Sequence, residues 1–392
     1  MKGKLIATAF AASLALASPS LAQPLQDRLE GLLESFQQGY GFPGVTAAIA
    51  FHDGNVVTAA TGLADVEFNA PMRPETRMLA ASLGKSFVAM TALSLENDGV
   101  LDRSDLVSRH LGQRDWFARL PNHGTMTVGD LMRHTSGLPD HVHLRSFQSE
   151  MAARMAGDSV AFTPEEAIGF VLDTEPLFPA GQAWAYSDTG YLLLGLVIEQ
   201  ASGSAYSDLV AERFLAPLGL TDTTPSDTRS LPGLAVGYVG ENNPFGLPPR
   251  TMDDAGRLLW DPATEWTGGG LVSSSRDLAV WGHALFGGTA MAEPYLDRLL
   301  NAVAVSPDAP GILYGAGVAI YADTPRGPVY GHGGWIPGYV SSLRHYADHE
   351  VTVAFQINTD AGVVDDSTDL VPALEAALAD LAISSVKEMD QP

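Results

Sequence analysis

A serine and a lysine three residues apart, Ser82 and Lys85, stand in the apolar stretch LAASLGKSF of residues 79–87. A serine hydroxyl becomes a useful nucleophile only when a neighbouring base takes its proton. On a helix, side chains at positions i and i+3 share one face, with Cβ atoms about 5 to 6 Å apart, so the Lys85 amine can reach the Ser82 hydroxyl. The spacing predicts a serine nucleophile with a lysine base.

The choice of lysine at position 85 supports this interpretation. The chain has four lysines, and Lys85 is the only one between Lys4 and Lys387. Arginine cannot be deprotonated in a protein, whereas the pKa of a buried lysine shifts readily. The alternative is a surface lysine that lies beside a helix-capping serine. Apolar residues on both sides of the pair favour a buried site.

Two further motifs follow in the sequence, Tyr186-Ser187-Asp188 and His332-Gly333-Gly334. In this order the three motifs resemble the Ser-x-x-Lys, Tyr-x-Asn and Lys-Thr-Gly motifs of serine β-lactamases and penicillin-binding proteins. Other phrases resemble the class C β-lactamase-like group, which includes D-alanyl-D-alanine carboxypeptidases, D-aminopeptidases and esterases. These phrases are LMRHTSGL at 131–138, GYLLLGLVIEQASG at 190–203 and GGLVSSSRDL at 269–278.

The resemblance implies a role for each matching residue. Ser82 would be acylated, and Lys85 and Tyr186 would exchange its proton and later activate water. A positive Lys85 would lower the phenol pKa of Tyr186 from about 10. The backbone N–H groups of Ser82 and Trp335 would form the oxyanion hole. Without the resemblance, Tyr186 would be interpreted as a buried tyrosine in a loop. No cofactor is implied.

Three positions depart from the penicillin-type motifs. Asp188 replaces asparagine and, when ionised, only accepts hydrogen bonds, so it would pair with Lys85 or with a substrate ammonium. A pair with Lys85 would keep the lysine charged and shift the base role to Tyr186. His332 replaces lysine and is mostly neutral at pH 7, and Gly333 replaces threonine. With Gly334, these residues are expected to bind the substrate, and they favour esters, amides or amino-terminal substrates over carboxylate-bearing β-lactams.

Several alternatives remain open from the sequence. The chain fits a β-lactamase or a D-alanyl-D-alanine carboxypeptidase less well than an esterase, amidase or peptidase. The Asp188 substitution also suggests a non-catalytic sensor or binding module. An α/β-hydrolase esterase would require a parallel sheet around Ser82. The histidines of LPDHVHL, His141 and His143, are interpreted as part of a solvated loop rather than as metal ligands.

The first 22 residues have the pattern of a secretory signal peptide, with two lysines, an apolar stretch and a small-residue cleavage site. This predicts export to the periplasm or the medium. The formal net charge is −24, and loss of Lys2 and Lys4 leaves 20 Lys and Arg against 46 Asp and Glu, or −26. Such a charge disfavours nucleic acid and anionic membrane surfaces as partners, and no later segment predicts a membrane span. The expected partner is a small-molecule or peptide substrate.

Hydrophobic periodicity predicts an α+β fold. An antiparallel sheet is built from both chain ends and packed by N- and C-terminal helices, and an all-helical lobe is inserted between them. The predicted parts are a sheet lobe of 23–105 and 265–385, a mainly helical lobe of 106–264 and a tail of 386–392. Long loops are expected at 140–160 and 221–266. An Asp-Gly hairpin is expected at residues 53–54, and a final helix from about 367 to 381.

Overall fold

The computed structural model describes residues 24–241, 243–363 and 366–389, so the predicted signal peptide lies outside the described residues. Its centre is a nine-stranded sheet in the order β3-β2-β1-β12-β11-β10-β9-β8-β7. All neighbouring strands run antiparallel, which excludes the parallel sheet of an α/β-hydrolase. The predicted antiparallel sheet built from both chain ends is therefore confirmed, because β1 pairs with β12.

The strands of this sheet are β1 Gly44–Ala50, β2 Val56–Asp65, β3 Ala70–Pro71, β7 Val303–Ala304, β8 Ile312–Tyr314, β9 Ala319–Tyr321, β10 Val329–Ile336, β11 Tyr339–Tyr346 and β12 Val351–Ile357. A second, three-stranded sheet consists of β4 Met78–Leu79, β6 Leu271–Ser273 and β5 Thr224–Pro225.

The β1–β2 hairpin forms as its sequence predicts. Gly54 takes the left-handed conformation at φ 83°, and the Asp53 carboxylate accepts a hydrogen bond of 2.9 Å from the Asn55 N–H. Aspartate and glycine are the residues that such tight turns require. The turn sets the register in which Val45 pairs with Thr61, and all seven residues of β1 are buried in the centre of the sheet.

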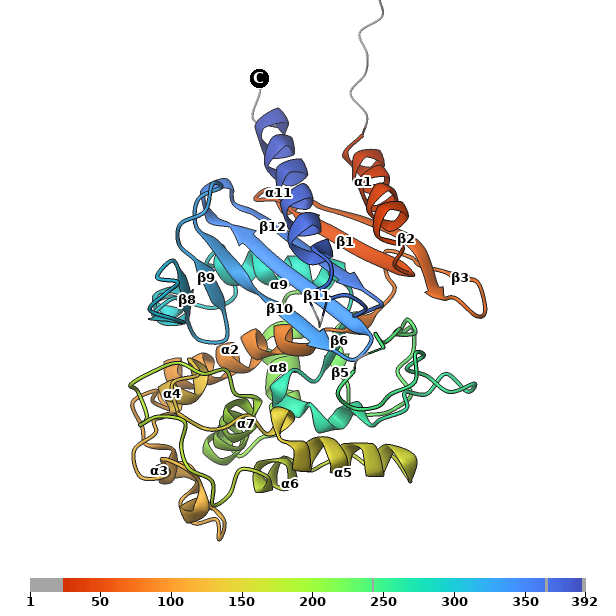
Figure 1. Cartoon of the computed structure of the whole chain (residues 1–392). Helices are drawn as coiled ribbons and strands as arrows, with labels where there is room; N and C mark the ends of the chain where they lie inside the picture. Colours follow the sequence, from red (N-terminus) through yellow and green to blue (C-terminus); the bar gives the residue numbers. More distant parts are fainter. Residues whose placement is uncertain (1–23, 242, 364–365, 390–392) are drawn as a thin grey trace, which may run out of the picture.

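Helices cover both faces of the large sheet (Figure 1). Helices α1 (Leu25–Tyr40) and α11 (Leu370–Met389) pack against one face and against each other. Helix α9 (Ser275–Phe286) packs on the opposite face against β1, β11 and β12. Ser274 caps it by accepting from the Asp277 N–H at 3.2 Å, as the sequence indicates. Helix α11 continues to Met389, beyond the predicted end near residue 381.

The segment between the two parts of the sheet is rich in helices (Figure 1). They are α2 Gly84–Asn97, α3 Val107–Leu111, α4 Val128–Met132, α5 Arg145–Ala156, α6 Pro164–Gly169, α7 Asp188–Ser202 and α8 Tyr206–Val210. Helix α10 (Tyr295–Leu299) follows α9. Short helical turns are η1 Ala81–Leu83, η2 Phe117–Arg119, η3 His141–His143, the π-turn η4 Ala211–Leu215, η5 Pro262–Thr264, η6 Trp266–Gly268 and η7 Ala347–His349.

The prediction of a loop at 140–160 is wrong, because η3 and α5 occupy most of it. Helix α5 buries two side chains, Phe147 and Met151, which are one helical turn apart. With Met155 they recur at every fourth residue, a helical spacing that the prediction of a loop overlooked. Helix α4 ends at Met132, before His134, which adopts a left-handed backbone at φ 59°. Within residues 24–241, 243–363 and 366–389, no helix is long and apolar enough to cross a membrane.

Candidate active site

Ser82 lies in a tight turn between β4 and α2. Ala81, directly before it, has a positive φ of 51°, which is uncommon for a residue with a side chain. The turn packs against Gly269, where an added Cβ would lie 2.5 Å from the Ala81 carbonyl oxygen and 3.0 Å from the Ser82 nitrogen. Ser82 lines a cavity of about 430 Å³. A strained, closely packed turn thus presents the hydroxyl to the cavity.

Lys85 is completely buried one turn below Ser82. Its ammonium donates to the Ser82 Oγ at 3.2 Å, to the Asp188 carboxylate and to the Gly268 carbonyl. Three N–H groups therefore meet three acceptors, the arrangement that suits a charged ammonium. Burial, the largest single effect, lowers the pKa of Lys85, but the Asp188 carboxylate and Tyr186 together outweigh it and raise the pKa above its ordinary value. The structure thus contains the Lys85–Asp188 ion pair that the sequence suggested.

Tyr186 reaches Ser82 from the other side. Its hydroxyl donates to the Ser82 Oγ at 2.8 Å, and the Lys85 Nζ lies 4.9 Å from the centre of its ring. Burial raises the pKa of the Tyr186 phenol, although the Lys85 charge acts in the opposite direction. The predicted lowering of this pKa is therefore wrong, because burial is the larger effect. Ser187 caps α7 by accepting from the Gly190 N–H at 3.2 Å, which places Asp188 in its first turn.

Strand β10 runs past the Ser82 turn. An added Cβ on Gly334 would lie 2.4 Å from the Ala80 oxygen and 2.3 Å from the Ser341 Oγ, so only glycine lets the strand approach this closely. On Gly333, an added Cβ would meet no described atom within 4 Å. The ring of Trp335 lines the cavity, and its indole N–H donates to Asp360 at 3.0 Å. We call Ser82, Lys85 and the β10 glycines the floor of the pocket.

His332 also lines the cavity, but its nitrogens contact protein groups. Nε2 lies 2.8 Å from the Tyr314 hydroxyl, and Nδ1 lies 2.5 Å from the Gly333 carbonyl oxygen. The residue is 7% exposed, and burial lowers its pKa to about 3. His332 is therefore neutral at pH 7, as expected from its residue type, and its neutrality is reinforced by burial.

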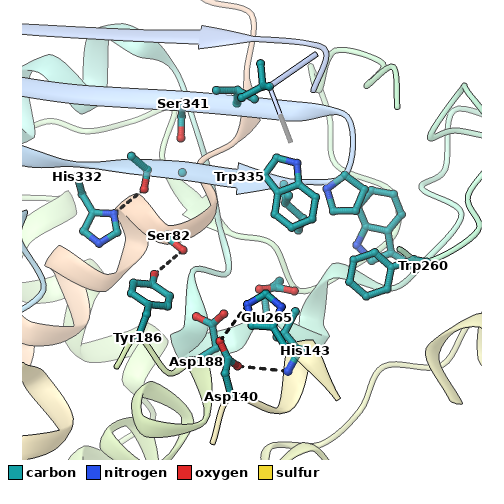
Figure 2. Close-up of a pocket in the computed structure, with 18 of the residues that line it drawn as sticks. Ser82, Asp140, His143, Tyr186, Asp188, Trp260, Glu265, His332, Trp335 and Ser341 are labelled. Carbon is teal, nitrogen blue, oxygen red and sulfur yellow. Dashed lines mark hydrogen bonds and ion pairs between the residues drawn. The ribbon is translucent and has the colours of Figure 1, made fainter. Parts of the chain in front are cut away.

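Two carboxylates that the sequence did not single out as substrate-binding groups lie beside Asp188. Asp140 and Glu265 both line the cavity with Ser82 (Figure 2). An ideal Cβ on Gly268 would be 3.8 Å from one oxygen of Asp188 and equally far from one of Glu265. Burial, followed by repulsion from Asp188, raises the pKa of Asp140 to about 8 and that of Glu265 to about 7. Three carboxylates thus surround one side of the pocket.

The interpretation of the LPDHVHL segment as a solvated loop is wrong for its centre. Asp140 and His141 are buried, and the His141 Nδ1 lies 3.0 Å from the Thr189 hydroxyl. His143 alone is well exposed, 3.9 Å from the Asp140 carboxylate. Over the described part of the chain, no three His, Asp or Glu side chains are grouped so that they could hold a metal ion.

Apart from Ser341 and the Arg344–Glu375 ion pair, much of the remaining lining is apolar and comes from segments far apart in the sequence. Its side chains are Phe147, Met151 and Met155 of α5, together with Phe245, Leu247 and Trp260 of the long 243–261 segment. We call these residues, with Asp140 and Glu265, the wall of the pocket.

The fold and pocket geometry agree with the comparisons with known proteins. Residues 29–378 match the family model described as Beta-lactamase. Penicillin-binding protein 4* of Bacillus subtilis is 26% identical over 351 residues, which cover 86% of this chain and 73% of that protein. The D-aminopeptidase of Brucella anthropi is 27% identical over 340 residues, which cover 86% of this chain but 60% of the relative's own length.

A solved structure is similar over nearly the whole chain. It is the D-amino acid amidase from Ochrobactrum anthropi SV3 complexed with L-phenylalanine amide, with a TM-score of 0.74 and 25% identity. The match covers 94% of this chain and 99% of that chain. The molecule therefore belongs to the β-lactamase family. It is a serine hydrolase of that family, and the alternative of a non-catalytic sensor module is not retained.

Proposed function

We propose that the chain is an exported serine hydrolase that forms an acyl-enzyme at Ser82 on amides, esters or D-peptides with a free α-ammonium group. The observation that carries this proposal is the group of three carboxylates, Asp188, Asp140 and Glu265, that lines one cavity with Ser82. Carboxylates accept hydrogen bonds from an ammonium and attract its charge, most strongly in a partly desolvated pocket. Export rests on the signal-peptide pattern of the first 22 residues.

In the proposed reaction, Tyr186 first gives its phenol proton to solvent, against the effect of burial on its pKa. The phenolate then takes the proton of Ser82 while the Oγ forms a bond to the substrate carbonyl carbon. The backbone N–H groups of Ser82 and Trp335 hold the oxyanion. The C–N bond then breaks as the Tyr186 phenol protonates the leaving nitrogen. Water attacks the acyl-enzyme, gives its proton to Tyr186 and releases the acid, and Ser82 recovers its proton. Lys85 remains an ammonium throughout and stabilises the phenolate.

The same charges argue against β-lactams and terminal D-alanine peptides as preferred substrates. Both carry a carboxylate, which would enter a pocket already lined by three acidic side chains. The motif positions that hold lysine and threonine in the penicillin-type pattern are a buried, neutral His332 and the bare Gly333. Arg344 also lines the cavity, but it is paired with Glu375 at 2.9 Å, and the ionised carboxylates of the pocket would repel a substrate carboxylate.

The names of the relatives support amino-terminal substrates and D-stereochemistry. One relative is a D-aminopeptidase, and the neighbouring structure is a D-amino acid amidase. The apolar side chains of the wall would contact the side chain of the substrate's amino acid. We therefore extend the proposal to D-amino acid amides and to short peptides with an N-terminal D-residue.

The test compares D- and L-phenylalanine amide, N-acetyl-D-phenylalanine amide and a chromogenic cephalosporin with wild type and Ser82→Ala. We expect fast turnover of the free D-amide, a large loss on N-acetylation, and loss of about 10³-fold or more in Ser82→Ala. A p-nitrophenyl ester should leave an acyl adduct on Ser82 in mass spectrometry. Faster turnover of the cephalosporin than of every amide would reject the substrate class, and full activity of Ser82→Ala would reject the mechanism.

A further inference from the structure

A continuous chain of hydrogen bonds passes behind Tyr186 and joins two of the three sequence motifs, Tyr186-Ser187-Asp188 and His332-Gly333-Gly334. The backbone N–H of Ser187 donates to the His134 Nδ1 at 3.2 Å, and the His134 Nε2 lies 3.2 Å from the Tyr314 hydroxyl. The same hydroxyl lies 2.8 Å from the His332 Nε2, and the His332 Nδ1 lies 2.5 Å from the Gly333 carbonyl oxygen. We call the three side chains of His134, Tyr314 and His332 the relay.

The two backbone groups at its ends fix where the relay protons lie. A backbone N–H only donates, so the His134 Nδ1 must accept, and its neutral ring carries the proton on Nε2. A carbonyl oxygen only accepts, so the His332 Nδ1 must carry a proton. The Tyr314 hydroxyl lies between the two rings, where it accepts from His134 and donates to the bare Nε2 of His332. All the polar contacts are then satisfied without a charged ring.

The surroundings of the relay favour neutral imidazoles. His134 and Tyr314 are 1% and 3% exposed, so neither ring nor phenol meets bulk water. The charged groups that act on His332 are Lys85 of α2, Arg344 of β11 and Asp188 of α7. Burial and the Lys85 charge lower the pKa of both histidines, and at His332 the hydrogen bond to the Gly333 carbonyl and the Asp188 charge act against them.

The relay also packs around Tyr186. Its ring centre lies 4.2 Å from that of His134, 6.2 Å from that of His332 and 6.4 Å from that of Tyr314. The ring nitrogens of His134 and His332 bond to the Tyr314 hydroxyl and to the backbone rather than to Tyr186. The Tyr186 hydroxyl bonds instead to the Ser82 Oγ, at 2.8 Å. Figure 2 shows Ser82 between Tyr186 and the β10 residues that His332 supports.

We infer that Tyr314 is a positioning residue of the proposed hydrolase. It donates to the His332 Nε2 and so holds that ring in the neutral Nδ1–H form, which anchors the Gly333 carbonyl beside Ser82. Two consequences follow for the reaction. The β10 segment with the Trp335 N–H keeps one orientation, and Lys85 remains the cation nearest Tyr186 among these groups. The effect on rate rests on the proposed function, whereas the tautomer does not.

The first test is direct observation of the tautomer. The full chain is labelled with ¹⁵N-histidine, and the signals of His332 are assigned by their loss in His332→Asn. At pH 7, His332 should show a protonated Nδ1 and an unprotonated Nε2 that accepts a hydrogen bond. In Tyr314→Phe, the ¹⁵N chemical shift of the His332 Nε2 should change to that of a nitrogen that accepts no hydrogen bond. A His332 ring that is an imidazolium or an Nε2–H tautomer in wild type would overturn the inference. This result does not depend on which substrate the protein cleaves.

The second test compares Tyr314→Phe with Tyr295→Phe on D-phenylalanine amide. Tyr295 is an equally buried tyrosine whose hydroxyl donates to the Leu285 carbonyl at 2.8 Å, away from the pocket. Misplacement of a supporting group costs up to about 10²-fold in rate, so we expect Tyr314→Phe to lower kcat at least about tenfold with little change in KM. Tyr295→Phe should leave kcat and the His332 signals unchanged.

A double-mutant cycle separates positioning from a general packing effect. In His332→Asn, the side-chain amide can still donate to the Gly333 carbonyl but has no ring nitrogen for Tyr314. Adding Tyr314→Phe to this variant should therefore cost little further kcat. Fully additive losses, or a Tyr314→Phe variant with wild-type kcat and an unchanged tautomer, would refute the positioning role. If Ser82→Ala stays active, the proposed function fails, while the tautomer measurement still decides the state of His332.

Discussion

The floor and the wall of the pocket are built in different ways. In the floor, the backbone is packed so closely that only glycine fits at Gly269, against the Ser82 turn, and at Gly334, against Ala80. The Lys85 ammonium also donates to three acceptors there, one of them its ion-pair partner. The wall comes from α5, the 243–261 segment and two carboxylates with raised pKa values. From this difference we propose that the floor sets the rate of the chemistry and that the wall sets which substrate binds and at which pH.

The largest expected effect comes from the floor, in Lys85→Arg. The guanidinium keeps the charge but is larger and cannot place its donors on the three acceptors of a fully buried ammonium. We expect kcat to fall by up to about 10³-fold, on the scale of losing a group that stabilises charge in the transition state. Lys387→Arg at the exposed end of α11 is the matched control, and its kinetics should equal wild type. Near-normal kcat in Lys85→Arg would contradict the proposed role of the lysine.

The second prediction compares two neighbouring glycines. In Gly334→Ala the new Cβ would press on the Ala80 oxygen, which we expect to lower kcat about 10²-fold and to cost about 1–3 kcal/mol of folding free energy. In Gly333→Ala the new Cβ would meet open space, so kcat and Tm should stay near wild type while KM changes. Substrate kinetics and thermal melts of both variants give the comparison, and equal losses in the two would remove the distinction between the two positions.

The third and smallest effect concerns the wall, in Asp140→Asn. With a pKa of about 8, Asp140 becomes an anion only as the pH rises through 8, while a substrate α-ammonium of ordinary pKa about 7.7–8.0 loses its charge there. KM of wild type should therefore be lowest near pH 8. Asp140→Asn should raise KM several-fold at pH 8 and change it little at pH 6. A pH-independent effect on KM would show that the charge of Asp140 does not contribute to binding.

The same variant has an expected effect on stability. The folded pKa of Asp140 lies above its unfolded value of about 3.9, so the folded state binds the proton more tightly. Its contribution to stability is then lost progressively as the pH rises from about 4 to 8. Asp140→Asn should raise Tm relative to wild type at pH 8 and have no such effect near pH 4. Melting curves at both pH values measure this.

The sequence predicted the floor better than the wall for a physical reason. Ser82 and Lys85 are three residues apart, and Asp188 follows Tyr186 by two, so local spacing alone brought out each motif. The hairpin at Gly54 was equally local, and the antiparallel sheet followed from strand patterns at both chain ends. Local geometry of this kind is what residue periodicity encodes.

The wall depends on contacts that no local pattern reveals. Asp140 and Glu265 are 125 positions apart, and each is an ordinary acidic residue until the fold places it beside Asp188. Helix α5 is an exception, because Phe147, Met151 and Met155 recur at helical spacing and the prediction of a loop overlooked them. The raised phenol pKa of Tyr186 was missed because desolvation depends on the whole pocket and not on the one charged neighbour that the sequence suggests.

The burial of Lys85 has a practical consequence for chemical labelling. Residues 24–389 contain two lysines, and Lys85 has no exposed surface, while Lys387 is exposed near the end of α11. Amine-reactive reagents need a free, accessible amine, so within this range they should modify Lys387 and spare Lys85. The lysine at which a dye or a solid support attaches would thus be Lys387, in the last turn of α11, and the α-amino group of the chain is the other amine that would react. The scarcity of lysine makes the folded protein suitable for oriented immobilisation without further mutation.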